Sequence, residues 1–497
     1  MDRIARECRH AMAEATDYGA WRDAAAALDR REGLDDWKAD ETSADYDWRL
    51  IRSRLRQLRD YQSSGDIKRL TRHLRQGLHW NLGNIGNPGL YSHSRVGTKH
   101  LIHDYINQVV AVLNYICDTD FEDFSFKDKV KFFQELSLSY GRSALMLSGG
   151  ATLGLFHVGV LKALYEEDLL PNVISGSSAG AVVAATVGTR TPEEMTELVQ
   201  PESSYYHFWK PLKPAQMVEQ RALMDPSQVR KAIAVNVRDL TFEEGFELSG
   251  KEVNITVSPA ASNQPPRLLN HLTFPYLYMR EAVLASGSVP FLFPPVMLMG
   301  KDEHGERTPF MPLLKWNDGS LKSDLPMLRL RRLHNVNHFV VSQTNPHVIP
   351  FLTKSSPGES GLINSGRELA MATARQTSRN LLNFARANLP PNGVRSHLEN
   401  VASMLDQDYR GHVTIFPEIS LWRFAKVTAN PNLADVTRFI LEGQRSSWTR
   451  MSMVRNQVAI GQTLERCIVR LERRAKTTDR RAAARPAALR VVRSKSA

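Results

Sequence analysis

The sequence predicts an α/β fold with a mostly parallel central sheet, flanked by helical N- and C-terminal regions. Between residues 143 and 188, short apolar runs alternate with glycine turns and helical segments. SALMLS and NVIS are typical of buried strands, and GLFHVGVLKALYEEDLL and AGAVVAATVG are typical of helices. Strand, glycine loop and helix, repeated in this order, indicate parallel strands joined by crossover helices. VNITVSP and HFVVSQ supply further strands.

Helical periodicity dominates the chain on both sides of this region. Apolar residues recur every three or four positions in the stretches 48–58, 67–78 and 101–116, and glycines at 83 to 97 predict a long ordered loop. After about residue 355 helical periods return, as in GRELAMATARQTSRNLLNFARANL. We therefore expect a helical N-terminal domain over 1–140, an α/β domain over 141–355, a helical C-terminal region over 356–470 and a disordered basic tail over 471–497.

Composition indicates a globular protein with a large core. The chain has 497 residues, of which 42% are hydrophobic and 24% are charged. Three widely spaced cysteines predict neither a disulfide framework nor a zinc cluster, which fits a reducing compartment. The first residues lack the apolar region of a secretory signal, and no stretch is long and apolar enough to span a membrane. We expect a cytoplasmic protein that contacts membranes only peripherally.

The net charge of +11 is concentrated at the C-terminal end. Residues 472–497 carry nine Lys or Arg and two acids. Such a segment either binds a polyanion, such as nucleic acid or anionic lipid, or only keeps the protein soluble. We expect no nucleic-acid partner, and the sequence leaves lipid contact and a solubilising tail as open alternatives.

The pentapeptide GSSAG at residues 176–180 is the main catalytic signal. Its G-x-S-x-G frame lies where an apolar strand ends and a helix begins. So sharp a reversal strains the central residue, Ser178, while Gly176 and Gly180 remove the side chains that would clash. The hydroxyl of Ser178 then stands at a helix N-terminus, which favours negative charge. An ordinary glycine turn is the alternative, and the strand–turn–helix context favours a nucleophilic serine.

The segment SGGATLG, about thirty residues upstream, is a candidate oxyanion hole. Gly149, Gly150 and Ala151 lie between a strand and a helix, and such small residues let backbone N–H groups approach a substrate oxygen. The alternative is a dinucleotide-binding loop, which requires G-x-G-x-x-G and an acidic residue after the next strand. The next strand leads into ISGSS without an acid, so we expect no nucleotide cofactor.

A serine nucleophile needs a general base within hydrogen-bond reach. No histidine downstream of GSSAG lies in a recognisable catalytic loop, and His338 and His347 flank the strand HFVVSQ. The other candidate is Asp318 in KWNDGSLKSDLP, which follows a short apolar run and precedes Gly319. The residues alone leave a Ser–His–Asp triad and a Ser–Asp pair open. The histidine candidates are His207, His271, His334, His338, His347 and His412.

The motifs SGGATLG, GSSAG and NDGS, in this order, resemble those of the patatin-like phospholipase family. ASGSVPFLFPP resembles the family segment between the elbow and the aspartate. The similarity is greatest to the branch of yeast and plant storage-triacylglycerol lipases. It extends to LHWNLGNIGNPGLY and GTKHLIHDYI before the motifs, and to NVNHFVVSQTNPH and DQDYRGHVTIFP after them.

This resemblance implies a three-layer α/β/α fold and a catalytic Ser–Asp dyad that uses no histidine, metal or organic cofactor. Two positions depart from the family pattern. Ala151 stands in place of the third glycine, and Asp324 stands where many members have an asparagine, which makes Asp324 a second candidate base. The implied roles are Ser178 as nucleophile, Asp318 as proton acceptor, and Gly149, Gly150 and Ala151 as oxyanion hole.

We therefore predict an intracellular serine lipase of the triacylglycerol class that forms an acyl-enzyme. The alternatives are a phospholipase A or lysophospholipase with the same site, and acyl transfer to a lysophospholipid, which the resemblance implies for some members. The acyltransferase signature of His and Asp separated by four residues is absent. A non-enzymatic membrane scaffold is expected to lack the serine or the aspartate, and both are present. The expected partners are a lipid substrate and the surface of a membrane or lipid droplet.

The segment SSYYHFWKPLKP at residues 203–214 has two interpretations. Aromatic rings beside lysines suit a membrane interface, where rings lie among lipid headgroups. Aromatic rings are equally common as core anchors, with the lysines in solvent. PFLFPPVMLM is interpreted as core and acyl-pocket wall. The residues concerned are Tyr205, Tyr206, Phe208, Trp209, Lys210 and Lys213.

Overall fold

The computed structural model describes residues 3–198, 206–220, 222–260, 264–346, 348–349, 352, 409–418 and 420–493. The chain divides into two compact units. The first contains Met1–Glu32, Ser92–Val96 and Ser143–Val454, and the second contains Gly33–Tyr91, Gly97–Arg142 and Arg455–Ala497. The α/β region thus begins near the expected residue 141. The first 32 residues join it instead of the other N-terminal helices, and the residues from 455 onward join the second unit.

The first unit is built around a seven-stranded sheet with the order β4-β3-β2-β1-β8-β9, in which β7 also pairs with β3. Strands β1, β2 and β3 are parallel, with Ala144 opposite Val173 and Val173 opposite Glu252. Strands β8 and β9 are parallel to each other, whereas β4 and β7 are antiparallel to β3. The prediction of a mostly parallel sheet is confirmed. The strands are β1 (Arg142–Leu147), β2 (Val173–Gly176), β3 (Glu252–Pro259), β4 (Arg267–Leu269), β7 (Trp316–Asp318), β8 (Val336–Ser342) and β9 (Val413–Ile415).

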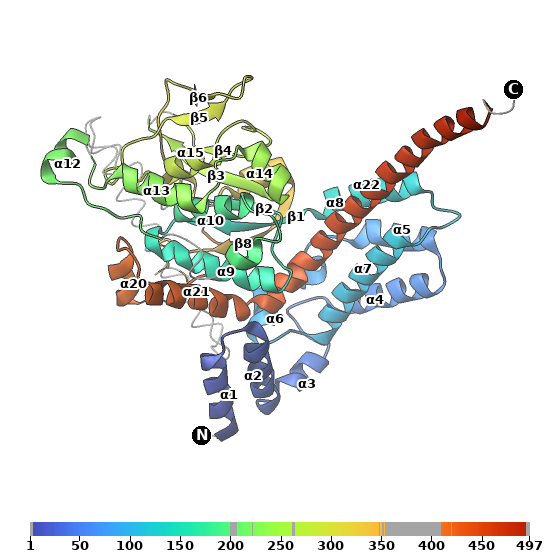
Figure 1. Ribbon diagram of the computed structural model, residues 1–497. Coiled ribbons are helices and arrows are strands. Elements are labelled where there is room, and N and C mark those ends of the chain that lie inside the picture. Colours follow the sequence, from blue (N-terminus) through green and yellow to red (C-terminus); the bar gives the residue numbers. More distant parts are fainter. Residues whose placement is uncertain are drawn as a thin grey trace, which may run out of the picture. The chain divides into compact units, whose positions relative to one another are not determined.

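Helices cover both faces of this sheet and form the expected three layers (Figure 1). On one face, Ala144 and Met146 of β1 pack with Leu330 of α17 (Met327–His334). On the other face, α10 (Ala179–Gly188) packs so closely that a Cβ on Gly188 would lie 2.2 Å from the side chain of Val253. The two faces alternate along each strand, as the two-residue period of a β-strand requires.

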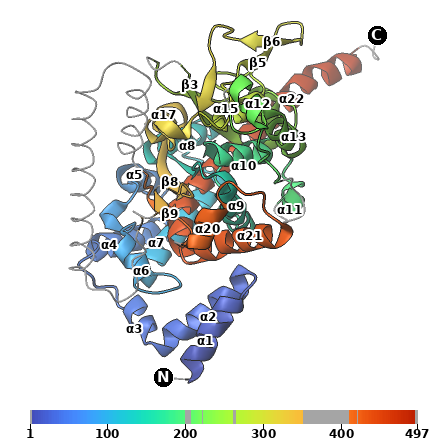
Figure 2. The same ribbon diagram turned by 90° about the vertical axis from the view of Figure 1, so that its left-hand side faces the viewer.

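Helices α9 (Leu155–Glu166) and α21 (Leu433–Trp448) lie side by side in the first unit (Figure 1 and Figure 2). Their backbones touch at two glycines. A Cβ on Gly159 would lie 1.9 Å from the carbonyl oxygen of Ile440, and one on Gly443 would lie 2.2 Å from that of Phe156. Only glycine permits so close an approach.

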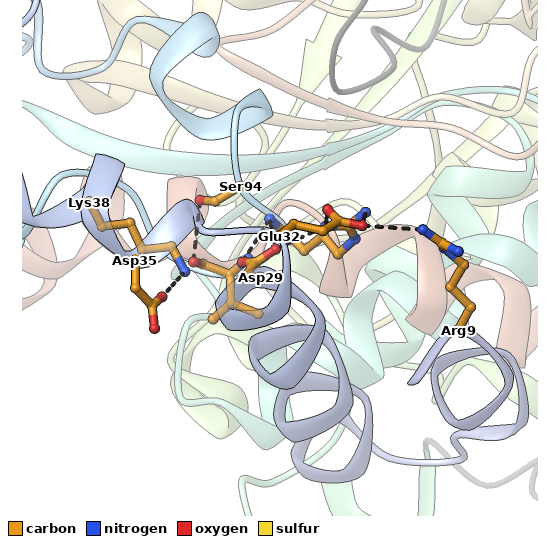
Figure 3. Close-up of polar contacts among 8 residues, drawn as sticks. Arg9, Asp29, Glu32, Asp35, Lys38 and Ser94 are labelled. Atoms are coloured by element: carbon orange, nitrogen blue, oxygen red, sulfur yellow. Dashed lines mark hydrogen bonds and ion pairs between the residues drawn. The ribbon is translucent and has the colours of Figure 1, made fainter. Parts of the chain in front are cut away.

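The N-terminal helices α1 (Arg3–Glu14) and α2 (Tyr18–Arg31) belong to the first unit through specific contacts. The rings of Trp21 and Trp448 lie 6.4 Å apart. The buried carboxylate of Asp29 accepts the backbone N–H groups of Arg95 and Val96, both at 3.1 Å. The Arg95 guanidinium also bridges Asp29 and Glu32, and Glu32 pairs with Arg9 as well (Figure 3).

The remaining elements of the first unit are short. Strands β5 (Leu298–Lys301) and β6 (Arg307–Phe310) form a separate antiparallel pair. The others are η2 (Ala151–Gly154), α11 (Met195–Leu198), α12 (Pro214–Gln220), α13 (Pro226–Asn236), α14 (Phe242–Ser249), α15 (Met279–Ser286), α16 (Ser320–Ser323) and α20 (Leu421–Lys426).

The second unit is helical. Helix α4 buries Ile51, Leu55 and Leu58 and packs against α7, which is buried along most of its length, as its apolar sequence predicts. The loop predicted at residues 83–97, between α5 and α7, contains most of a short 3-10 turn, η1, and one short helix, α6. The elements are α3 (Leu34–Ala39), α4 (Trp48–Ser63), α5 (Ile67–Gly77), η1 (Leu82–Asn84), α6 (Pro88–Ser92), α7 (His100–Asp118), α8 (Phe126–Tyr140) and α22 (Met451–Arg493).

The C-terminal stretch differs from the expectation of a disordered tail over 471–497. Helix α22 continues through this range to Arg493. Its many Ala and Arg residues are strong helix formers, so local propensity extends a helix that composition and charge alone did not predict. Residues 494–497 and the stretch GRELAMATARQTSRNLLNFARANL, for which the sequence predicts a helix, lie outside the described residues. In the part of the chain that is described, no helix is long and apolar enough to cross a membrane.

Candidate active site

Ser178 occupies a strained turn between β2 and α10. Its backbone angles are φ 51° and ψ −117°, a region that non-glycine residues rarely adopt. A Cβ on Gly176 would lie 2.3 Å from the carbonyl oxygen of Gly180, and a Cβ on Gly180 would lie 2.2 Å from that of Leu147. Both flanking positions therefore require glycine, and the serine hydroxyl is held clear of its own backbone, as in a nucleophile elbow.

Asp318 faces Ser178 from the end of β7. This strand pairs with β3, which places Val257 opposite Asp318, and the carboxyl group is 1% exposed. The Ser320 N–H donates a hydrogen bond to the carboxylate at 2.7 Å, and the Ser178 side chain lies near enough to lower the pKa of this carboxyl. Burial raises the pKa of Asp318 from 3.8 to about 6, against the opposing effect of the hydrogen bonds from Ser320 and Ser178. The carboxyl is thus a better base than an exposed aspartate.

The segment ASGSVPFLFPP holds both residues in place. The Ser286 hydroxyl, at the end of α15, accepts the backbone N–H of Ser178 at 2.9 Å. The carbonyl oxygen of Ser288 accepts the N–H of Asp318 at 3.0 Å. Sequence reasoning gave Ser286 and Ser288 no role of their own, because nothing local marks which residues of this segment touch the elbow.

The glycine loop after β1 lies against the same site. A Cβ on Gly149 would lie 3.5 Å from the Cβ of Ser178. The Gly149 N–H, however, donates to the Asp324 carboxylate at 2.8 Å, so it is already bound. Ala151 has a φ of 53°, the left-handed region in which glycine is easiest to accommodate. The structure thus leaves Gly150 and Ala151 as the amides of this loop with no acceptor among the described residues.

Two sequence families match the chain. Residues 2–138 match DUF3336, a domain of unknown function, and residues 145–331 match the patatin-like phospholipases. Triacylglycerol lipase ptl3 of Schizosaccharomyces pombe is 33% identical to this chain over 487 residues, which cover 95% of this chain and 99% of ptl3. The chain belongs to the patatin-like phospholipase family.

Other proteins of the patatin-like family are similar over most of this chain but are longer. Triacylglycerol lipase SDP1L of Arabidopsis thaliana is 33% identical over 96% of this chain and 60% of its own length. Triacylglycerol lipase 4 of Saccharomyces cerevisiae is 34% identical over 94% of this chain and 53% of its own length. The chain therefore spans somewhat more than half of these two relatives.

Among solved structures, VipD from Legionella pneumophila matches this patatin-like chain with a TM-score of 0.28 and 13% identity. The match covers 61% of this chain and 67% of VipD. The fold class rests on the sheet order and the family match instead of on this likeness.

The histidines of this patatin-like protein take structural positions where the structure describes them. His338 is buried in β8, with its ring 6.2 Å from that of His412. His157 bonds the Ser342 hydroxyl and the Ser148 carbonyl under the glycine loop, and burial lowers its pKa to about 4. His347 lies outside the described residues. No histidine among those described is hydrogen-bonded to Ser178 or Asp318.

An apolar cavity of about 120 Å³ extends from Ser178 into the helix layer of the patatin-like unit. Ala151 and Ser178 lie in its wall, and Val182, Val183 and Val187 follow the same face of α10. The lining residues that the structure describes include no Lys, Arg or His, and their few polar side chains are mostly hydroxyls. Such a cavity matches a hydrocarbon chain attached to an ester carbonyl at Ser178.

The aromatic segment before α12 contributes to this cavity. Tyr206, Phe208 and Trp209 line it, which favours the interpretation as anchors over the interpretation as a membrane interface. The Trp209 indole N–H donates to the Thr152 hydroxyl at 2.8 Å, and its ring lies 6.0 Å from that of Phe293. Tyr205 lies outside the described residues.

Only some residues of the segment PFLFPPVMLM lie in the core or in the cavity wall, where the sequence predicts the whole segment to lie. Phe293 lines the cavity, and Val296 and Leu298 are buried. Phe291, however, is 61% exposed, with a strained φ of 69°. The segment therefore presents one aromatic ring to the cavity and another to the surface.

Proposed function

We propose that this protein is a serine lipase that hydrolyses acylglycerol esters, with triacylglycerol as its substrate class. The observation that carries the proposal is the strained Ser178 elbow, which lies beside the buried Asp318 carboxyl and in the wall of an apolar cavity. Among the described residues, the cavity lining has no cationic group for a phosphate headgroup, which favours a neutral glyceride over a phospholipid near the reacting ester. The relatives ptl3, SDP1L and lipase 4 carry the name triacylglycerol lipase.

The reaction follows from the two side chains. The Ser178 oxygen attacks the ester carbonyl carbon, and its proton passes to Asp318. The Gly150 and Ala151 N–H groups stabilise the resulting oxyanion. The carbon–oxygen bond to the glyceride then breaks, the leaving alkoxide takes the proton from Asp318, and the acyl group remains on Ser178. Water repeats the sequence, with Asp318 as base, and releases the fatty acid and the free serine.

A parallel substrate assay tests this function. Purified protein is incubated with tri-, di- and monoacylglycerol, with phosphatidylcholine and with lysophosphatidylcholine, and released fatty acid is measured against Ser178→Ala. We expect triacylglycerol to be the preferred substrate. A preference for either phospholipid would assign a phospholipase A or lysophospholipase instead, and fatty acid transferred to lysophospholipid would assign an acyltransferase. Release that Ser178→Ala does not reduce would overturn the proposal.

The cavity predicts a dependence on acyl-chain length. Val183 lies five residues beyond Ser178 on α10, which is about 7.5 Å at 1.5 Å per residue. Val183→Phe should fill the cavity at this depth, so we expect kcat/KM for p-nitrophenyl palmitate to fall about tenfold or more. The value for p-nitrophenyl butyrate should change less than twofold, because a short chain ends before this point.

The matched control is Thr437→Phe, at an exposed position of α21. It introduces the same ring away from the cavity and should leave both esters unaffected. If Val183→Phe lowers kcat/KM equally for the long and the short ester, the substitution has distorted α10. If kcat/KM is unchanged for both esters, the acyl chain does not bind in this cavity.

We further propose that the basic end of α22 contacts anionic lipid surfaces. Arg474 pairs with Asp120 at 2.9 Å, whereas residues 478–497 carry six Lys or Arg and one acid. Each basic residue near an anionic membrane contributes up to about 1 kcal/mol, and salt weakens the effect. Truncation after Thr477 keeps the Arg474 pair, and we expect it to reduce sedimentation with phosphatidylserine-containing vesicles several-fold at low salt.

The same truncation should leave hydrolysis of p-nitrophenyl butyrate unchanged within twofold, since this ester is soluble. Neutral phosphatidylcholine vesicles serve as the control. If full-length and truncated proteins sediment equally with the anionic vesicles at low salt, the basic end only keeps the protein soluble.

A further inference from the structure

Asp324 is a buried carboxyl group that the proposed Ser178–Asp318 reaction does not use. It follows α16, six residues after Asp318, and is 1% exposed. One carboxylate oxygen accepts the Gly149 N–H at 2.8 Å and the other accepts the Asn345 side-chain amide at 3.0 Å. Both oxygens are thus bonded on the side of the glycine loop, so this second candidate base faces that loop and not the nucleophile.

The Gly149 backbone is bonded on both sides. Its N–H is held by Asp324, and its carbonyl oxygen accepts the hydroxyls of Ser148 at 2.8 Å and Thr344 at 3.1 Å. The next residue packs closely against the same partner, because a Cβ on Gly150 would lie 2.2 Å from the Thr344 hydroxyl oxygen. Fixing the Gly149 peptide on both sides fixes the direction of the amides that follow it.

We propose that Asp324 is a positioning residue for the oxyanion hole. Its carboxylate anchors the Gly149 amide, so that the N–H groups of Gly150 and Ala151 face an ester carbonyl at Ser178. The proposal rests on the proposed ester hydrolysis and narrows the expected three-amide oxyanion hole to two amides. An amide already bound to a carboxylate is not free to stabilise a second anion.

The charge on Asp324 also couples to the base. Burial raises the pKa of Asp324 to about 7, against the Gly149 and Asn345 hydrogen bonds, and the charge of Asp318 raises it further. Asp318 on β7 is the ionisable group that faces it among the described residues. Gly149 after β1 and Asn345 after β8 are neutral, and His157 beyond Thr344 is held neutral by its lowered pKa. The two carboxyl groups therefore titrate as a pair.

Two substitutions distinguish the effect of Asp324 on the position of the glycine loop from the effect of its charge. Asp324→Ala removes the acceptor for Gly149, and we expect kcat for p-nitrophenyl butyrate to fall about 10- to 100-fold with KM changed less than threefold. Asp324→Asn retains an acceptor oxygen of the same shape, and it should recover kcat to within about fivefold of wild type near pH 8. Such rescue distinguishes positioning from a need for charge.

The pH profile tests whether activity needs the charge of Asp324. A protonated Asp324 keeps a carbonyl oxygen that can accept the Gly149 N–H, as an asparagine does, so only Asp318 must ionise for activity. The positioning role therefore predicts that log(kcat/KM) falls with a slope approaching one below about pH 6 in both the wild type and Asp324→Asn. A slope of two in the wild type that becomes one in Asp324→Asn would show that the charge of Asp324 is needed, and would overturn the positioning role. Hydrogen exchange of the peptide that contains Gly149 should quicken in Asp324→Ala and stay slow in Asp324→Asn, whether or not the ester is turned over.

The control is Ser258→Ala, a buried hydroxyl of β3 that has no hydrogen-bond partner in the described part of the chain. Wild-type kcat in Asp324→Ala would overturn the positioning role. The same holds if Asp324→Asn loses as much kcat as Asp324→Ala. Absence of Ser178-dependent turnover in the wild type would instead refute the proposed function, and exchange at Gly149 would then still decide whether Asp324 holds the loop.

Discussion

Ser178→Ala should abolish both ester hydrolysis and covalent labelling by a fluorophosphonate probe. The strained elbow and the buried Asp318 carboxyl beside it support our proposal that Ser178 is an activated nucleophile. Removal of a serine nucleophile lowers kcat by roughly 10⁶ in a well-studied serine hydrolase, and we expect a loss of this order. The measurement is probe labelling resolved by peptide mass spectrometry, together with p-nitrophenyl butyrate turnover.

Ser175→Ala is the matched control for this experiment. Ser175 lies in β2 three residues before the nucleophile, is 1% exposed, and its hydroxyl has no hydrogen-bond partner in the described part of the chain. This variant should label and turn over like the wild type. Labelling of Ser178→Ala at the wild-type level, or labelling at another serine, would show that the nucleophile lies elsewhere.

The α/β core was predictable because its signals are local. Strands β1 and β2, the glycine turns that follow them and helices α9 and α10 are adjacent in sequence, and each turn has the small residues that its geometry requires. The assignment of the first 32 residues was not predictable in this way. It depends on Trp21 meeting Trp448, and on Asp29 meeting backbone amides 66 and 67 residues away. No periodicity or composition encodes such pairings.

The same distinction applies to the candidate site. Ser178 and Asp318 follow from motifs, because a nucleophile elbow and a strand-end Asp-Gly each have a short sequence pattern. The Asp324–Gly149 bond joins residues 175 apart, and the Ser286 hydroxyl reaches Ser178 across 108 residues. Sequence reasoning could note that Asp324 replaces an asparagine. It could not tell whether that carboxylate faces the nucleophile or the glycine loop, since this depends on how α16 packs against β3.

Asp318→Asn should lower kcat by about 10² to 10⁴, because it retains the shape of the side chain and removes the general base. In the wild type, kcat/KM should decrease as the pH falls through about 6, where Asp318 becomes protonated. The measurement is the pH profile of p-nitrophenyl butyrate hydrolysis. His338→Ala is the comparison, and we expect a folded His338→Ala protein to stay within a few-fold of wild type. Loss of activity in His338→Ala with half the rate left in Asp318→Asn would favour a histidine triad.

Asp318→Asn should also change stability, in the direction opposite to activity. Folding raises the pKa of Asp318 from 3.8 to about 6, so the folded state binds this proton more tightly than the unfolded state does. The contribution of this proton binding to the free energy of unfolding is fully present below about pH 3.8 and is lost as the pH rises through about 6. Near pH 8 the buried carboxylate therefore costs on the order of 1–3 kcal/mol, which an amide avoids. We expect Asp318→Asn to raise Tm by a few degrees near pH 8 and to leave it nearly unchanged near pH 4, as measured by differential scanning calorimetry. A decrease in both the Tm and the kcat of Asp318→Asn near pH 8 would contradict this expectation. It would mean that Asp318 stabilises the fold at this pH, and another residue of the site would then have to be the destabilising base.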